Sequence, residues 1–268
     1  MGASYAGFRW EVADGVGTAT LSRPEKLNAL TFGIYDELVR LFAEVGDDPA
    51  VRAVVLRGEG RAFCSGGDVN EIIGNLLDRP LADRLAFTRM TCALVRNIRL
   101  CPVPVVASLH GAVAGAGAVI ALACDLRVAA ASTRISFLFT NVGLTGADMG
   151  AAWLLPRIVG LGRASEILLL GDAVEAEEAG RIGLVNRVVP DERLAEETAA
   201  LVRRLADGAA AGIRETKILL QAEQEVGFMA ALEAEAAGQA LLLGGPDHRE
   251  YHRAFNEKRK PDFRKGKA

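Results

Sequence analysis

The feature that most constrains this chain is a buried strand that runs into a glycine-rich turn and then into a helix. Pro104–Leu109 has the character of the strand, His110-Gly111 that of the turn, and Gly115–Ala123 that of a helix of small residues. Another apolar strand is expected at Leu126–Ala131. Strands that alternate with helices are joined by right-handed crossovers. The sequence therefore predicts an α/β fold with a mainly parallel sheet.

The segments on either side of this pattern differ from each other. The N-terminal part predicts a hairpin turning at Asp14-Gly15, and helices that begin after Thr31 and Asp68. From about Asp191 onward only helices are expected. Their ranges are Arg193–Ala206, Gly212–Val226, Met229–Leu243 and Asp247–Lys260. We therefore predict a core at residues 1–190 that holds the site, and a helical oligomerisation section at residues 191–268, because these helices carry many apolar residues.

Composition excludes several classes of function. A formal net charge of -3 does not favour a nucleic-acid surface, which needs a basic stripe. The four cysteines show no C-x-x-C spacing, and three histidines make a multi-histidine metal site unexpected. No signal-peptide pattern and no apolar run of membrane-spanning length is present. We expect a soluble cytoplasmic protein with neither a metal nor a membrane contact.

Two glycine-rich turns are the main candidates for chemistry. One is Ala62–Asp68 and the other is His110–Ala118. Small residues in such turns permit tight bends and close packing of helix on sheet. Alternatively, each turn presents backbone N–H groups at a helix N-terminus, where negative charge is favoured. Two such donors directed at one oxygen would form an oxyanion hole.

Five ordered segments resemble motifs of the crotonase (enoyl-CoA hydratase/isomerase) family. The matching segments are Arg23–Leu30, Ala62–Asp68, Pro104–Asp125, Gly171–Val189 and Tyr251–Phe263. The resemblance spans nearly the whole chain. It implies a crotonase-like spiral of ββα units with a helical C-terminal trimerisation section, assembled as a homotrimer or a dimer of trimers. It also implies a coenzyme A thioester as substrate and no permanently bound cofactor.

The same resemblance implies roles for individual residues. It places the oxyanion donors at the backbone N–H groups of Gly67 and Ala116, with Gly115 or Gly117 replacing Ala116 if the register differs by one. Ala116 stands where the family usually has glycine, which is acceptable if its φ is negative. Phe255 and Lys258 would reach the coenzyme A of a neighbouring subunit, or would belong to an ordinary amphipathic terminal helix. Further coenzyme A contacts are implied at Lys26, Leu27, Ala29, Gly66, Gly67, Asp68, Val69, Asn70 and Gly115.

The acid–base residues depart from the hydratase pattern. Family hydratases use two glutamates, and by count Val119 and Asn141 occupy their positions. The remaining carboxylate is Asp148, which either caps a helix or faces the acyl group. The stretch Asp148–Arg157 resembles a segment of family isomerases of the ring-1,2-epoxyphenylacetyl-CoA and dienoyl-CoA types. Val119, Asn141 and Trp153 are candidates for the acyl pocket, which we expect residues 72–89 to shape.

These residues favour proton transfer beside a thioester carbonyl. Asp148 would shift a double bond, with Gly67 and Ala116 stabilising the enolate. The alternatives are an enoyl-CoA hydratase that uses Asp148 and a water, a CoA-thioester hydrolase or dehalogenase, and a non-catalytic acyl-CoA-binding subunit. Structural roles are expected for Asp68 and Asp125 as cap and turn residues, for His110 in its turn and for Cys64 in packing.

Overall fold

A seven-stranded sheet forms the centre of the molecule in the computed structural model, which describes residues 3–5 and 7–264. The strand order is β1-β2-β3-β4-β5-β7-β10, and all neighbours from β3 onward run parallel, as predicted. The predicted hairpin joins β2 to β3, where Asp14 and Gly15 both have positive φ. The strands are β1 (Ala3–Ser4), β2 (Phe8–Ala13), β3 (Val16–Leu21), β4 (Ala53–Gly58), β5 (Val105–Leu109), β7 (Leu126–Ala130) and β10 (Arg187–Val189).

A smaller sheet lies at the end of this one and is entered through the predicted His110-Gly111 turn. It contains β6 (Ala112–Ala114), β8 (Arg134–Ser136) and β9 (Ala173–Glu175). Gly111 has a φ of 54°, and a Cβ atom there would lie 2.1 Å from the Arg61 carbonyl oxygen. Only glycine fits so close an approach. The chain therefore passes from the large sheet to the small sheet at a position that tolerates no side chain.

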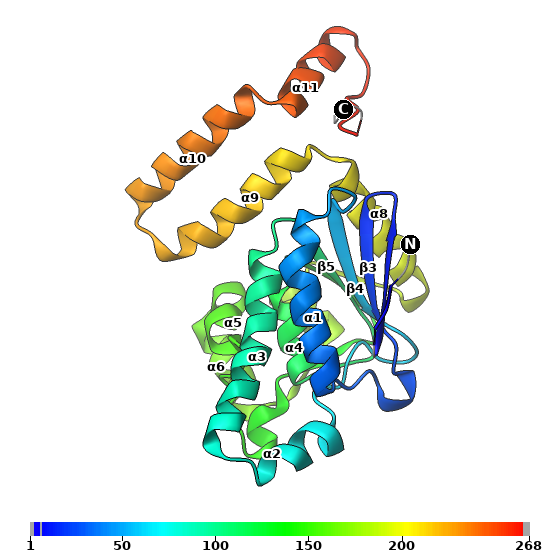
Figure 1. Ribbon diagram of the computed structural model, residues 1–268, viewed down its shortest axis with the longest axis vertical. Helices are drawn as coiled ribbons and strands as arrows, with labels where there is room; N and C mark the ends of the chain where they lie inside the picture. Colours follow the sequence, from blue (N-terminus) through cyan, green and yellow to red (C-terminus); the bar gives the residue numbers. More distant parts are fainter. Residues whose placement is uncertain (1–2, 6, 265–268) are drawn as a thin grey trace.

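Helices cover both faces of the large sheet (Figure 1). On one face α1 packs against α3, α3 against α4, α4 against α5, and α5 against α6. On the other face α8 contacts β3, β4, β5 and β7. These helices are α1 (Phe32–Glu44), α3 (Leu81–Leu100), α4 (Ala116–Ala123), α5 (Ala151–Val159), α6 (Leu161–Leu170) and α8 (Leu194–Asp207). Shorter helices are η1 (Pro24–Lys26), η2 (Val45–Asp47), η3 (Val69–Gly74), α2 (Asn75–Leu77), η4 (Leu138–Val142), α7 (Ala176–Arg181), η5 (Asp191–Arg193) and η6 (Glu223–Glu225).

The apolar pattern of each helix explains its position. Thr31 caps α1, accepting a hydrogen bond from the Ile34 N–H at 3.4 Å, as expected. All eight residues of α4 are buried, because the helix itself carries small or aliphatic side chains on every face. α8 buries Leu194, Val202 and Ala206 against the sheet. The core therefore extends past residue 190, and α8 is part of it.

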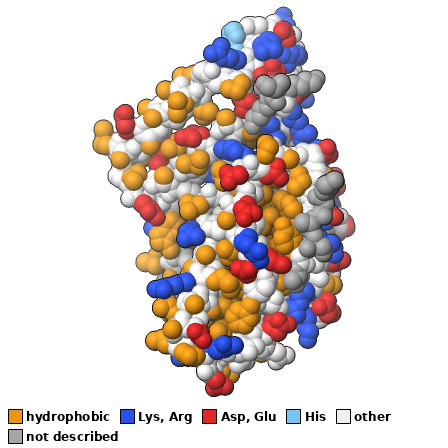
Figure 2. Space-filling model, in the orientation of Figure 1, with side chains coloured by type: hydrophobic (Ala, Val, Ile, Leu, Met, Phe, Trp, Pro, Cys, Tyr) orange, Lys and Arg blue, Asp and Glu red, His pale blue; other side chains and the backbone are white. Residues whose placement is uncertain are grey.

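The last three helices extend from this core, and we call them the C-terminal arm: α9 (Ala210–Ala222), α10 (Phe228–Leu243) and α11 (Pro246–Asn256). Figure 1 shows α10 and α11 beyond the end of the sheet, and Figure 2 shows hydrophobic side chains over this part of the surface. Met229 is 75% exposed and Leu241 is 79% exposed. The terminal helix was expected to reach Lys260, but it ends at Asn256, because Lys258 adopts a left-handed φ of 53°. None of the described helices has the length and apolar character needed to cross a membrane.

Candidate active site

The loop before α1 is held in place by Asn28. Its side-chain amide donates to the carbonyl oxygens of Glu59 and Ala62 at 2.9 and 2.8 Å, and its Oδ1 accepts from the Arg23 N–H at 2.9 Å. Asn28 has a φ of 57° and is 2% exposed. Asparagine tolerates this left-handed conformation better than most residues. Sequence reasoning placed no function on Asn28, although it fixes the loop that supports the first glycine-rich turn.

The first glycine-rich turn pairs with the residue just before α1. The Leu30 N–H donates to the Gly66 carbonyl oxygen, and the Asp68 N–H donates to the Leu30 carbonyl oxygen, both at 2.8 Å. Gly66 has a φ of 103°, which favours glycine. The Gly67 N–H is the donor of none of the loop and turn hydrogen bonds of the described residues. It therefore remains able to bind a ligand.

The second turn orients Ala116 at the start of α4. Gly115 has φ 52° and ψ −124°, and its N–H donates to the Ser136 carbonyl oxygen at 2.9 Å. The Gly115 N–H is thus engaged and is not the alternative donor. Ala116 is the first residue of α4 and is not among the described residues with positive φ. Its methyl group is accommodated, and its N–H is one of those that a helix leaves without a helical partner.

The two turns touch each other. A Cβ atom at Gly66 would lie 3.1 Å from the Ala114 oxygen and 3.6 Å from the Ala116 nitrogen. At Gly117 it would lie 2.6 Å from the Cys64 oxygen. A parallel β-bridge between Cys64 and Val113 joins the two turns. This close approach sets Gly66 beside the nitrogen of Ala116, so the two turns adjoin at the residues predicted to supply the oxyanion donors.

The expected structural residues near these turns are confirmed in that role. Cys64 is fully buried, its Sγ donates to the Asn28 carbonyl oxygen at 3.2 Å, and burial raises its pKa to about 12. A thiol in this state is a packing group. The His110 ring nitrogen Nε2 lies 3.0 Å from the Gly60 oxygen. Asp125 closes its turn by accepting from the Val105 N–H at 2.7 Å and pairs with Lys217 at 2.7 Å.

Asp148 lies in the loop between η4 and α5. α5 begins at Ala151 with Gly150 as its N-cap, so the interpretation of Asp148 as the cap is wrong. Its carboxylate instead accepts from the Met149 N–H at 2.9 Å. Burial raises the pKa of Asp148, and that hydrogen bond partly opposes the rise. A carboxylate with a raised pKa exchanges protons more readily near neutral pH.

The three acyl-pocket candidates, Val119, Asn141 and Trp153, lie in different surroundings. Val119 is fully buried inside α4. The Asn141 amide donates to the Gly171 carbonyl oxygen at 3.2 Å, which ties η4 to the end of α6. Trp153 lines a groove of about 730 Å³ between α3, α5 and α9, with the Arg157 guanidinium 3.8 Å from its ring centre. Gly67, Ala116 and Asp148 do not line that groove.

Apart from Gly115, which lies in the second turn, the implied coenzyme A residues fall into two groups. Those from 26 to 70 surround the first turn, and Asp68 caps η3 by accepting from the N–H groups of Asn70 and Glu71 at 3.1 Å each. Those backbone bonds, Glu71 first, and Arg23 lower the pKa of Asp68. Arg23, which sequence reasoning did not select, also donates to the Ala29 oxygen at 2.7 Å.

Phe255 and Lys258 belong to the arm, where Phe255 is 69% exposed. Figure 1 shows α11 at the opposite end of the molecule from α2.

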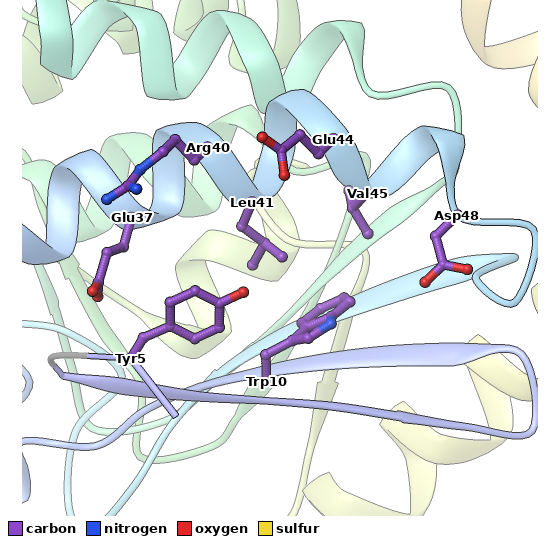
Figure 3. A pocket seen from close by; sticks show the side chains of 8 residues that line it. All are labelled: Tyr5, Trp10, Glu37, Arg40, Leu41, Glu44, Val45 and Asp48. Atoms are coloured by element: carbon purple, nitrogen blue, oxygen red, sulfur yellow. The ribbon is translucent and has the colours of Figure 1, made fainter. Parts of the chain in front are cut away.

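A separate hollow lies between the N-terminal hairpin and the outer side of α1 (Figure 3). Its volume is about 400 Å³, and none of the site residues lines it. The lining residues are Tyr5, Trp10, Glu37, Arg40, Leu41, Glu44, Val45 and Asp48.

Comparison with known proteins connects this geometry to a family. The model of the enoyl-CoA hydratase/isomerase family matches residues 11–266. A crystal structure from Streptomyces coelicolor A3(2), provisionally named an enoyl-CoA hydratase, has a TM-score of 0.95 and 56% identity over 97% of this chain and 94% of that one. A provisionally named enoyl-CoA hydratase of Rhodobacter capsulatus is 38% identical over 97% of this chain and 98% of its own length. The 1,2-epoxyphenylacetyl-CoA isomerase of Escherichia coli K12 is 36% identical over 94% and 96%.

Proposed function

Because this chain belongs to the enoyl-CoA hydratase/isomerase family, whose members act on acyl-CoA thioesters, we propose that it shifts the double bond of an enoyl-CoA. The single observation that carries the proposal is Asp148, a partly buried carboxylate with a raised pKa. At the two positions where hydratases of the family hold a pair of glutamates, this chain has Val119 and Asn141. One carboxylate is enough to move one proton between two carbons.

The proposed reaction uses the two turns and the carboxylate in sequence. The thioester oxygen accepts hydrogen bonds from the Gly67 and Ala116 N–H groups. The Asp148 carboxylate removes a proton from the acyl chain, and the electron pair moves onto the thioester oxygen as an enolate. The N–H donors stabilise this charge more than they stabilise the neutral carbonyl. The proton on Asp148 exchanges with solvent, and Asp148 then delivers a proton to a different carbon, so that no other reactant is consumed.

Enoyl-CoA hydration is the second candidate, and the names of the Streptomyces and Rhodobacter proteins favour it. In that reaction a water held by Asp148 would add to the double bond. The same oxyanion donors would stabilise the same enolate. The two reactions therefore differ in the group that reaches the carbon, a proton from Asp148 or the oxygen of a water.

We also propose that the chain assembles as a homotrimer, alone or as a dimer of trimers. The exposed apolar side chains of the arm support this, since surfaces of that kind usually mark protein contacts. Closed symmetry would bury the arm equivalently in each subunit. Phe255 and Lys258 would then act across an interface, on the coenzyme A of a neighbour.

The test is a panel of enoyl-CoA thioesters incubated in heavy water and followed by mass spectrometry. Isomerisation incorporates deuterium, hydration adds the mass of heavy water, and hydrolysis releases free coenzyme A. Asp148→Asn should reduce deuterium incorporation by about 10³-fold or more, because it removes the base. Asp172→Asn, an exposed aspartate in the turn after α6, is the matched control. Turnover of Asp148→Asn within a few-fold of the wild type would contradict the proposal.

A further inference from the structure

The groove between α3, α5 and α9 takes no part in the proposed reaction, since neither oxyanion donor nor Asp148 lines it. Its volume of about 730 Å³ is within the range of small-molecule sites. α9 lies beyond the C-terminal end of α3 (Figure 1), and the Lys217 ammonium of α9 donates to the Ile98 carbonyl oxygen of α3 at 3.3 Å. The walls of the groove are therefore fixed to one another within one subunit.

Most of the groove lining is apolar. Val95 and Leu154 form buried parts of the wall, at 6% and 5% exposure. Leu100 and Ile218 also line the groove, and they are 65% and 47% exposed. The lining residues of α3 extend from Cys92 to Leu100, which is about 12 Å by the helical rise. A space of this length with such walls suits an alkyl chain.

Arg99 is the polar group in the groove that lacks acceptors. Its Nη2 donates to the Gln221 Oε1 atom of α9, and its Nε is buried without a hydrogen-bond partner among the residues that the structure describes. Burial lowers the pKa of Arg99, but an arginine side chain keeps its charge in proteins. A buried donor without an acceptor destabilises a protein. Arg99 therefore has the capacity to bind an anion in the groove.

The charges around Arg99 also favour an anion. Arg96 and Lys217 are the other cations of the lining, and Glu225 is its one carboxylate. Lys217 is already paired with Asp125 at 2.7 Å. Arg96 is exposed, and its guanidinium contacts the neutral Asn97 side chain at 3.3 Å. The groove thus combines apolar walls with a guanidinium charge that no carboxylate of the described residues pairs with.

We propose that the groove binds an alkyl carboxylate of medium chain length, with its chain against Val95 and Leu154 and its carboxylate on Arg99. The planar guanidinium matches the geometry of a carboxylate, and the charged hydrogen bonds would supply the acceptor that Arg99 lacks. The chain would also remove apolar surface of Leu100 and Ile218 from water. This site goes beyond the proposed function and does not depend on it, because binding there needs neither the oxyanion donors nor Asp148.

The first experiment tests the contact between Arg99 and the carboxylate. Sodium decanoate, kept below its micelle-forming concentration, is titrated into the full-length protein by calorimetry, with 1-decanol as its uncharged match. We expect decanoate to bind at least about tenfold more tightly than 1-decanol, because only decanoate forms charged hydrogen bonds with Arg99. Arg99→Gln should abolish this difference. Arg89→Gln, at an exposed position of α3 outside the groove, should preserve it.

The second experiment tests the position of the chain. Ile218→Trp enlarges a side chain that lines the groove, and it should weaken decanoate binding about tenfold or more. Leu220→Trp makes a similar change at an exposed position of the same helix outside the groove and should leave the affinity unchanged. Decanoate should also raise the melting temperature of the wild type and of Leu220→Trp more than that of Ile218→Trp, because a ligand stabilises the folded state that binds it.

Three results would overturn the proposal. A wild type that binds no decanoate would remove the site altogether. Equal affinities for decanoate and 1-decanol would remove the role of Arg99. Decanoate binding that is unchanged in Ile218→Trp would show that the chain lies elsewhere. All the measurements are of binding or melting, so a failure of the isomerase assay would leave this proposal standing, and a failure here would leave the proposed function standing.

Discussion

The glycine-rich turns and the C-terminal arm differ in how far a single chain provides the contacts of their residues. Around the turns, Asn28, Arg23 and Ser136 supply hydrogen bonds that fix the backbone within one chain. The arm leaves side chains such as Phe228 and Met229 mostly in solvent, at 75% exposure each. Under the proposed function, a single subunit therefore contains both oxyanion donors, but it leaves most of the surface of α10 exposed. The comparison separates catalysis, which we expect from the core, from substrate affinity, which we expect to depend partly on assembly.

The largest effect should come from removing one oxyanion donor inside the core. Ala116→Pro deletes the N–H at the first position of α4, where proline fits a helix well. We expect kcat/KM to fall about 10²–10³-fold, the usual effect of losing one such donor. Ala210→Pro makes the same change at the first position of α9, where the alanine is similarly buried. Equal activity of the two proline variants in the mass-spectrometric assay would contradict the assignment of Ala116.

A smaller effect should follow from charging the arm. Met229→Asp combined with Leu241→Asp places two carboxylates on the apolar surface of α10, where desolvating them would oppose association. Sedimentation velocity should show wild type as a multiple of 28.4 kDa, and the variant should need at least about tenfold more protein to assemble. Gln239→Asp, at an exposed polar position of α10, is the control. A wild-type species of 28.4 kDa at micromolar concentration would remove the assembly proposal.

The smallest effect should be the change in the pKa of the Cys92 thiol when the charge of Asp148 is removed. Cys92 is the exposed one of the four free cysteines, and its pKa is raised by burial and then by the Asp148 charge. Asp148→Asn removes that charge, lowers the pKa of Cys92 and increases its thiolate fraction near pH 8. Alkylation of Cys92, measured by peptide mass spectrometry, should become about two- to fivefold faster. Asp148→Asn should increase the alkylation rate of Cys92 by the same factor when it is made in the Met229→Asp/Leu241→Asp variant. If the rate increases in neither background, Asp148 and Cys92 do not interact.

Sequence patterns predicted the α/β order, the hairpin and most helices, because local apolar periodicity and turn residues determine these elements. They also selected both glycine-rich turns, since each must pass close to another backbone. Asn28 was not selected for any role. Asn28 acts through carbonyl groups more than thirty positions away, at Glu59 and Ala62. The absence of a side-chain cap by Asp148 likewise depends on the backbone path at Met149 and Gly150, which have φ values of 50° and 91°.

The contact between the two turns has a consequence for how the protein matures. Gly67 and Ala116 are distant in sequence, and their placement requires Leu30 on one side and Ser136 on the other. Four segments must therefore close long loops before either N–H is correctly oriented, and such non-local closure is slow in folding. A chain emerging from the ribosome would possess most of its sheet and α1 before it could bind a thioester oxygen. Competence to bind should accordingly appear only when all four segments are in place, and it would report that these loops have closed.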